Sequence, residues 1–351
     1  MSRRWRVLII LLLFSLTPIL VLTPLILQEK WLATGIASFA VIGVVILTAS
    51  WSSRSMTRPL QVMVNAVHQL AKGDFSARMN IATGDERDLL AKAFNEMVPR
   101  LEDMMRMRRG LEMAQEVQQN LLPREIPDLP GLDIAATIIY CYETGGDYFD
   151  FFPCGKDCEG LGVVVGDVTG HGVAAALLMT TARALLRMRA VQLGTISEVV
   201  SSVNHQLTLD THESGSFMTL FYLAVDQANR SLRWVRAGHD PAIFYDSTTD
   251  QFEELLGSGL ALGVEKDWHY EGNEKTGLGT GQIIFLGTDG IWETRNMGGE
   301  MFGKERLYEI IRSNAQKPAK EIQKEVLAEL DRYRVSAAQE DDVTIVVIKV
   351  T

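Results

Sequence analysis

Acidic side chains in this 351-residue chain stand where apolar runs meet turns. Asp147 follows the glycine pair of "ETGGDYFDF", and Asp167 closes the apolar run of "VVVGDVTGHG". Asp289 closes "IIFLGTDG", while Asp341 and Asp342 directly precede the last apolar run, "VTIVVIKV". One such carboxylate usually only caps a turn, but glycine beside a ligand lets backbone or water approach closely. Four of them at strand edges form a candidate binding site assembled from four segments.

Carboxylates gathered in one place repel one another unless cations lie among them. Sites built only from oxygen ligands select hard ions such as Mg²⁺ or Mn²⁺. Two such ions about 3.5–4 Å apart would hold a bridging water for in-line attack on phosphorus. The residue types therefore indicate a two-metal centre that hydrolyses a phosphate ester.

The same glycine pair permits a competing interpretation, because "GGDYF" differs by one residue from GG[DE]EF, the loop of diguanylate cyclases. That chemistry needs a second carboxylate directly after the first, where this chain has Tyr148 and Phe149. It also has no use for Asp289 or Asp341. We therefore favour the metal centre, and formation of a cyclic dinucleotide from GTP would contradict it.

Further polar residues flank these aspartates. His171 could hydrogen-bond a water of the site or protonate a leaving serine oxygen, or it could simply be a turn residue. His239 in "RAGHDP" is expected to fix a turn. Asp150 and Glu143 are expected to support the site or the fold rather than to ligate a metal. Arg183 is the candidate for a contact to the substrate phosphate.

Composition excludes other classes. The formal net charge is −10 and no lysine or arginine stripe is present, which argues against nucleic-acid binding. Cys141, Cys154 and Cys158 form no disulfide framework. The pair in "CGKDC" lacks a second pair and a local histidine, so loop thiols are favoured over zinc ligands.

Two uncharged apolar runs, residues 7–27 and 31–51, are each long enough to cross a hydrocarbon core. Arginines precede the pair and follow it, which predicts a transmembrane hairpin in residues 1–52 with both ends in the cytoplasm. We expect a multi-pass membrane protein in contact with lipid. The alternative is a cleaved signal peptide.

Residues 53–104 show two amphipathic stretches joined by an extended connector. Pro59 can begin the first helix, and the acidic pair Asp85–Glu86 begins the second. The apolar positions are Leu60, Val64, Val67 and Leu70, then Phe94, Met97, Leu101 and Met104. This layout resembles a HAMP signalling domain, which implies a parallel four-helix coil and hence a homodimer. A generic amphipathic linker is the alternative.

A linker helix is expected over residues 105–123, continuing the apolar seam until a group of prolines ends it. Met104 to Met107 inserts an extra step of three, which overwinds a coiled coil locally. We hypothesise that this phase break converts helix rotation into activity.

Residues 124–351 alternate apolar strands with turns and two helical stretches, 172–191 and 318–334, which predicts an α/β sandwich.

Six motifs of the C-terminal part carry a family resemblance. They are "ETGGDYFDFF", "GDVTGHGVAAALLM", "RAGHDPAIFY", "LGTDGIWETRN", "GEMFGKERL" and "DDVTIVVIKV", in that order. They resemble the SpoIIE/RsbU-type serine/threonine phosphatases of the protein phosphatase 2C-like (PPM) superfamily, over residues 112–351. This implies a PPM-type α/β sandwich of two mainly antiparallel sheets flanked by helices.

The resemblance also implies site residues and a reaction. Asp147, Asp167 and the Val168 carbonyl would hold two Mn²⁺ or Mg²⁺ ions. Asp289 and Asp341 would complete the site, although Asp342 is not distinguished from Asp341. The implied activity is hydrolysis of phosphoserine or phosphothreonine, with a STAS-type anti-sigma-factor antagonist as the implied substrate. A catalytically inactive HAMP-linked scaffold is the alternative.

Overall fold

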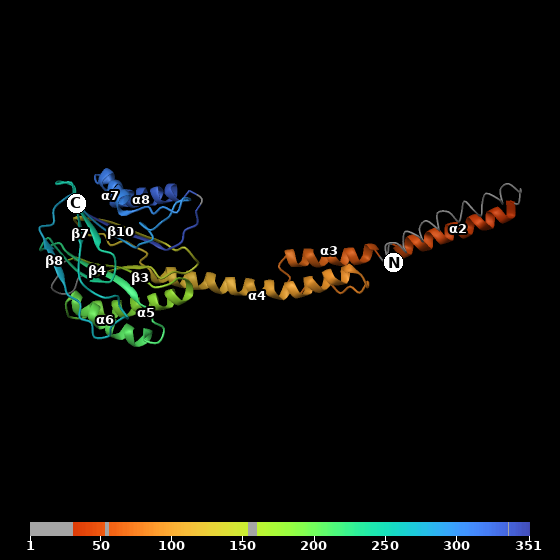
Figure 1. Cartoon of the computed structure of the whole chain (residues 1–351), viewed down its shortest axis with the longest axis horizontal. Helices are drawn as coiled ribbons and strands as arrows, with labels where there is room; N and C mark the ends of the chain where they lie inside the picture. Colours follow the sequence, from red (N-terminus) through yellow and green to blue (C-terminus); the bar gives the residue numbers. More distant parts are fainter. Residues whose placement is uncertain (1–30, 53–55, 154–159, 336) are drawn as a thin grey trace. The chain divides into compact units, whose positions relative to one another are not determined.

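The computed structural model describes residues 31–52, 56–153, 160–335 and 337–351. The chain divides into two compact units, Met1–Met107 and Arg108–Thr351 (Figure 1). The first predicted membrane span and the pair Cys154 and Cys158 lie outside the described residues. Helix α2, Trp31–Ser52, covers the second predicted span. No helix in the described part of the chain is long and apolar enough to cross a membrane, so the hairpin is not confirmed.

The N-terminal unit contains two amphipathic helices, as predicted. Helix α3 spans Arg58–Ala71 with Pro59 in its first turn, and helix α4 spans Glu86–Leu121. A small core joins them, formed by Met63, Ala66, Ala77, Met79, Ala91, Phe94 and Val98. Most of the predicted apolar positions do not belong to this core. Leu60, Val64 and Val67 are about half exposed, as is Met97, because within one chain the helices meet along a neighbouring stripe.

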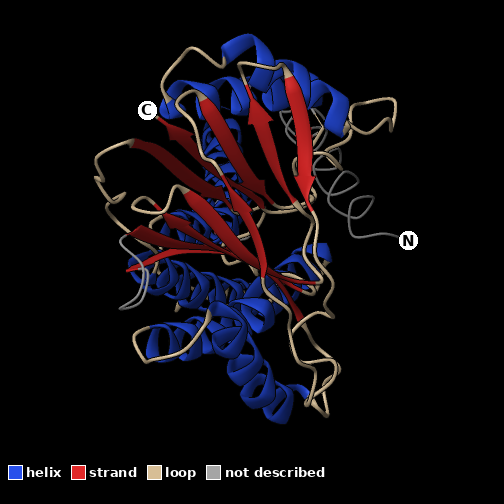
Figure 2. Cartoon of the chain, turned by 90° about the vertical axis from the view of Figure 1, so that its left-hand side faces the viewer, coloured by secondary structure: helices blue, strands red, loops and turns tan. Residues whose placement is uncertain are grey.

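The C-terminal unit is an α/β sandwich of two five-stranded sheets in which every strand pair is antiparallel (Figure 2). One sheet has the order β1-β10-β9-β6-β7 and the other β2-β3-β4-β5-β8. The first sheet consists of β1 (Leu132–Ile139), β10 (Val343–Val350), β9 (Gln282–Gly287), β6 (Ala242–Asp246) and β7 (Gln251–Leu255). The second consists of β2 (Tyr148–Pro153), β3 (Gly160–Val168), β4 (Met218–Asp226), β5 (Ser231–Ala237) and β8 (Asn273–Thr276).

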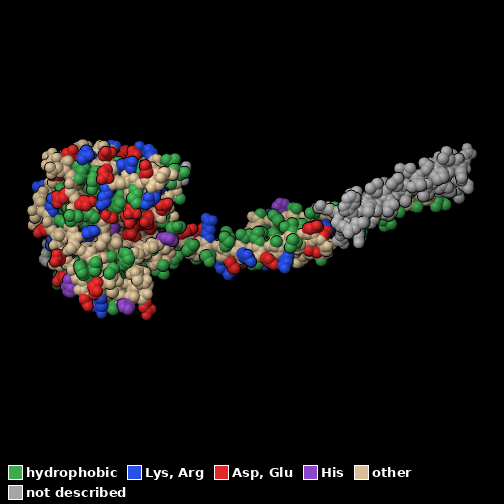
Figure 3. Space-filling view, viewed as in Figure 1, with side chains coloured by type: hydrophobic (Ala, Val, Ile, Leu, Met, Phe, Trp, Pro, Cys, Tyr) green, Lys and Arg blue, Asp and Glu red, His purple; other side chains and the backbone are tan. Residues whose placement is uncertain are grey.

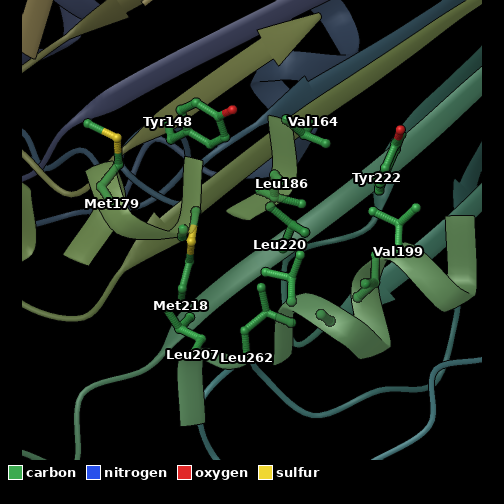
Figure 4. Packing of buried hydrophobic residues seen from close by; sticks show 14 of the residues in the cluster. Tyr148, Val164, Met179, Leu186, Val199, Leu207, Met218, Leu220, Tyr222 and Leu262 are labelled. Carbon is green, nitrogen blue, oxygen red and sulfur yellow. The ribbon is translucent and has the colours of Figure 1, made fainter. Parts of the chain in front are cut away.

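Helices cover the outer faces of both sheets, as the sequence predicts for a flanked sandwich. Helices α5 (Gly172–Ala190) and α6 (Ile196–Thr211) pack on the second sheet through Met179, Leu186 and Leu207 (Figure 4). Helices α7 (Lys304–Asn314) and α8 (Ala319–Arg334) pack on the first sheet. A third core, which includes Phe221 and Val346, fills the space between the sheets. The central strands β3, β4 and β10 are mostly apolar because both of their faces are buried.

The strand runs and both predicted helices are found close to their expected positions. Helices α6 and α7 were not predicted. The valines, serines and threonines of α6 have low helix propensity. A capping box compensates, since the Thr195 hydroxyl accepts from the Glu198 N–H while the Glu198 carboxylate accepts from the Thr195 N–H. Packing on the sheet then stabilises a helix that its composition alone does not favour.

Candidate metal centre

The strand pairing brings the predicted aspartates to one end of the sandwich. Tyr148 of β2 pairs with Gly166 of β3 in an antiparallel register. Asp147, directly before Tyr148, and Asp167, directly after Gly166, therefore lie at neighbouring positions. In the other sheet Gly287 of β9 pairs with Ile345 of β10, which leaves Asp289 and the Asp341–Asp342 pair just beyond the same edge. Asp147 and Asp342 are therefore far apart in the sequence but close together in the fold.

Asp147 is the buried member of this group, with 1% of its surface exposed. Its Oδ2 accepts hydrogen bonds from the hydroxyls of Thr288 (2.8 Å) and Thr344 (2.6 Å), which belong to the opposite sheet. Burial and the nearby Asp167 carboxylate raise the pKa of Asp147 well above its usual value, and the two threonines act in the opposite direction. The two sheets thus jointly orient one buried carboxylate.

The pKa values of the other three carboxylates are raised as well. Burial and the charges of Asp289 and Asp341 raise the pKa of Asp167 to about 8. Burial and Asp341 raise the pKa of Asp289 to about 6. The pKa of Asp341 is also raised, first by burial. Acidic side chains gather on the face of this unit that Figure 3 shows.

This donor set fits hard divalent cations, because it consists of oxygens whose mutual repulsion a cation would relieve. Within the described residues, no group of three or more acidic, histidine or cysteine side chains is arranged so that it could hold a metal ion. We therefore define the cluster by two observations: the aspartates raise one another's pKa, and they lie at the same end of the sandwich. The Val168 carbonyl lies at the same point, since a Cβ at Gly146 would come within 2.7 Å of this oxygen.

The two candidates at the start of β10 differ in their surroundings. Asp342 is buried, and its oxygens accept hydrogen bonds from the N–H groups of Cys141 (2.8 Å) and Gly146 (3.1 Å). Asp341 is exposed, and its Oδ1 accepts from the Asp342 N–H. Asp342 is thus engaged in holding the glycine turn before Asp147. The carboxylate of Asp341 faces the cluster, where it contributes to the raised pKa of Asp289.

His171 stands at the N-cap of α5, four residues after Asp167. Its ring packs against that of Tyr142, with 4.7 Å between ring centroids. Its charge lowers the pKa of Asp341, which places the imidazole near the acidic cluster. Glu143, which follows Tyr142, is exposed and has no hydrogen bond to the aspartates. His171 itself is exposed, so its imidazole is accessible at the rim of the cluster.

Asp150 lies in the core with no exposed surface and points toward helix α5. Its oxygens accept two hydrogen bonds from Arg187, both 2.6 Å long, and one from the Tyr148 hydroxyl. Arg183 is 3.8 Å from the same carboxylate. This contact places Arg183 beside Asp150, and its contact to the substrate phosphate stays a prediction.

His239 is buried at the same end of the sandwich, as expected for a residue that fixes a turn. Its Nδ1 lies 2.7 Å from the Thr219 hydroxyl of β4. Its backbone carbonyl accepts a hydrogen bond from Arg236. Burial lowers the pKa of the imidazole to about 4, so that it is neutral near neutral pH.

Several functional contacts of this site were not predicted from the sequence. Thr288 and Thr344 orient Asp147, and Tyr142 packs on His171. Gln118 is buried near the end of α4 and contacts the glycine turn. The threonines had a recognisable signal, since Thr288 directly precedes Asp289 and Thr344 lies two residues after Asp342 in an otherwise apolar run. Nothing in the local sequence distinguishes Gln118 from its neighbour Gln119.

Comparison with known proteins identifies relatives and a shared fold. Over 242 residues the chain is 28% identical to Phosphoserine phosphatase RsbU of Bacillus subtilis, covering 68% of this chain and 69% of that protein. It is 26% identical to Protein IcfG of Synechocystis over 345 residues, 88% of this chain, but spans only about half (54%) of that relative's length. The solved SiaA-PP2C domain of Pseudomonas aeruginosa shares the fold, with a TM-score of 0.62 and 24% identity, over 71% of this chain and 99% of that domain.

Family profiles match two segments. The HAMP domain profile matches residues 51–103. The profile described as Stage II sporulation protein E (SpoIIE) matches residues 157–351, more than half of the chain. That segment contains Asp167, Asp289 and Asp341, three of the four clustered aspartates. The chain belongs to the SpoIIE family and carries a HAMP domain ahead of its SpoIIE segment.

Proposed function

We propose that this protein is a metal-dependent phosphoprotein phosphatase that acts on phosphoserine or phosphothreonine in bacterial signal transduction. The observation that carries the proposal is the meeting of four aspartates at one end of the sandwich, with raised carboxylate pKa values. Perturbed groups that cluster in this way are typical of functional sites. Similarity to a protein named a phosphoserine phosphatase supports the same reaction class.

Each residue receives a role in this proposal. Asp147, Asp167 and the Val168 carbonyl would hold a pair of Mn²⁺ or Mg²⁺ ions, and Asp289 and Asp341 would complete the site. Bound ions would lower the pKa of a water and withdraw charge from the phosphoryl group. Thr288 and Thr344 keep the Asp147 carboxylate oriented toward the cluster.

His171 is proposed to donate the proton that the leaving serine oxygen needs. The imidazole is accessible at the rim of the acidic cluster, and packing against Tyr142 restricts its orientation. Serine is a poor leaving group as an alkoxide, so a positioned proton donor contributes typically 10²–10⁴-fold to such reactions. Replacing His171 by alanine should therefore slow phosphoserine hydrolysis much more than hydrolysis of an aryl phosphate, whose leaving group needs no proton.

The substrate is proposed to be a phosphorylated protein of the STAS type, by resemblance to the family. The exposed apolar positions of the N-terminal unit support a homodimer formed through the HAMP domain and linker helix. Leu60, Val64 and Val67 on α3 and Met97 on α4 would be covered by a second copy. Sedimentation of the full chain at low concentration tests whether it is a dimer. Val64→Lys is expected to shift the monomer–dimer equilibrium toward monomer.

Membrane attachment is proposed from the HAMP match and from the two apolar runs of the sequence. Arginines precede the first run and follow the second, which favours a cytoplasmic SpoIIE segment. Resistance of the chain to extraction from bacterial inner membranes by alkaline carbonate would support this, whereas full release would contradict it.

Release of phosphate from a phosphoserine protein by the purified chain tests the main proposal. We expect release with Mn²⁺ or Mg²⁺ and none with EDTA. Asp289→Asn should lower the rate by at least 100-fold while folding and oligomeric state are preserved. A wild-type chain that binds metal but releases no phosphate from a panel of such proteins would instead indicate an inactive scaffold.

A further inference from the structure

Helix α4 reaches the metal centre through one buried side chain. Gln118 lies three residues before the end of the helix and is 3% exposed, whereas the adjacent Gln119 is exposed. Its Nε2 donates to the Gly145 carbonyl at 2.7 Å, and its Oε1 accepts from the Gly145 N–H at 3.3 Å. One amide therefore satisfies both backbone groups of a single residue in the turn that precedes Asp147.

The turn has no room for an alternative arrangement. A Cβ at Gly145 would lie 2.0 Å from the Asp342 carboxylate and 2.2 Å from the Tyr140 ring. The next amide, that of Gly146, donates to Asp342, and the Tyr140 hydroxyl donates to the Asp147 carbonyl at 3.2 Å. Three side chains thus determine the path of the backbone up to Asp147. Gln118 is the one of these three that α4 contributes.

We infer that Gln118 is a positioning residue that holds the Gly145–Gly146 turn so that Asp147 can bind metal. A glycine pair has the greatest backbone freedom of any dipeptide, so its conformation must be imposed from outside. A carboxylate that must meet other ligands within a few tenths of an ångström depends on such support. This inference rests on the proposed metal centre, although the contact to the turn itself does not.

The test compares Gln118→Met with Gln119→Met in the full chain. Methionine keeps the length and most of the volume of glutamine but forms neither hydrogen bond. In the metal-free protein, hydrogen exchange of the peptide covering residues 141–147 should be faster in Gln118→Met than in Gln119→Met. Direct titration with Mn²⁺ should show binding weakened about 10-fold or more in Gln118→Met alone.

Kinetics separate positioning from general loss of structure. At an Mn²⁺ concentration that saturates the wild type, Gln118→Met should lower kcat while KM for the phosphoprotein changes less than twofold. Gln118→Glu keeps the acceptor and should restore protection of the Gly145 amide in the exchange experiment. Equal exchange rates and equal Mn²⁺ binding in the two methionine variants would overturn the inference. Absence of Mn²⁺ binding by the wild type would overturn the proposed metal centre, and the exchange comparison would still decide whether Gln118 holds the turn.

Discussion

The Thr344 hydroxyl donates a hydrogen bond to Oδ2 of Asp147 at 2.6 Å and so links the two sheets at the metal centre. Thr344 is the second residue of β10 and is fully buried, and Asp147 precedes β2 in the opposite sheet. Thr288 donates to the same oxygen. The orientation of one proposed ligand therefore depends on how the whole sandwich closes.

Replacing Thr344 by valine removes this donor and keeps the shape of the side chain. We expect Mn²⁺ binding to weaken about 10-fold, because the orientation of a ligand depends on its hydrogen-bond partners. The free energy of unfolding should fall by about 1–3 kcal/mol, since a buried oxygen loses a donor. Isothermal titration and urea unfolding measure the two effects. Thr181→Val is the control, because that hydroxyl bonds only within its own helix. Unchanged metal binding in Thr344→Val would contradict the role given to this contact.

Asparagine at positions 341 and 342 should have different consequences. Asp341→Asn should lower phosphatase activity at least 10-fold without destabilising the fold, because its carboxylate is exposed and faces Asp289. Asp342→Asn should lower the melting temperature as well, since both of its oxygens accept backbone N–H groups. Phosphate release and thermal unfolding of both variants check this. The reverse pattern would make Asp342 the ligand.

Metal-induced stabilisation should depend on pH. The pKa of Asp167 is raised to about 8, so this carboxyl binds more protons in the folded metal-free chain than in the unfolded chain. The metal-free protein should therefore lose stability as pH rises toward 8. Cations require the deprotonated carboxylate, so Mn²⁺ should raise the melting temperature more near pH 8 than near pH 6. Calorimetry with and without Mn²⁺ measures this, and an equal shift at both pH values would count against Asp167 as a ligand.

The Asp150–Arg187 pair should matter for stability and not for metal binding. Arg187→Ala leaves a buried carboxylate without its main partner, which typically costs about 3 kcal/mol. In the double variant with Asp150→Ala, the free energy of unfolding should fall by less than the sum of the two single-variant decreases, because the unpaired charge is gone. Chemical unfolding of the four proteins completes the cycle. A loss of Mn²⁺ affinity comparable with that of Thr344→Val would show that Asp150 does support the metal centre.

Much of the fold could be predicted from the sequence because its signals are local. The apolar runs around Val164 and Val346 are continuous, as expected for strands buried on both faces, and helix α5 follows a clear pattern. The four aspartates were recognisable from glycine neighbours and motif order. Helix α6 was missed because packing on β4 and β5, and not propensity, stabilises it.

By itself, the sequence determined which carboxylates could form a metal centre and that a SpoIIE-type sandwich would carry them. Only the tertiary structure shows which contacts these side chains make. It turned Asp150 toward Arg187, engaged both oxygens of Asp342 with backbone amides, and brought Gln118 onto the glycine turn. These roles depend on partners 27 to 201 positions away along the chain, as for Gly145 with Gln118 and Cys141 with Asp342. Residue type and local spacing carry no information about such partners, because only closure of the two sheets places them within hydrogen-bonding distance.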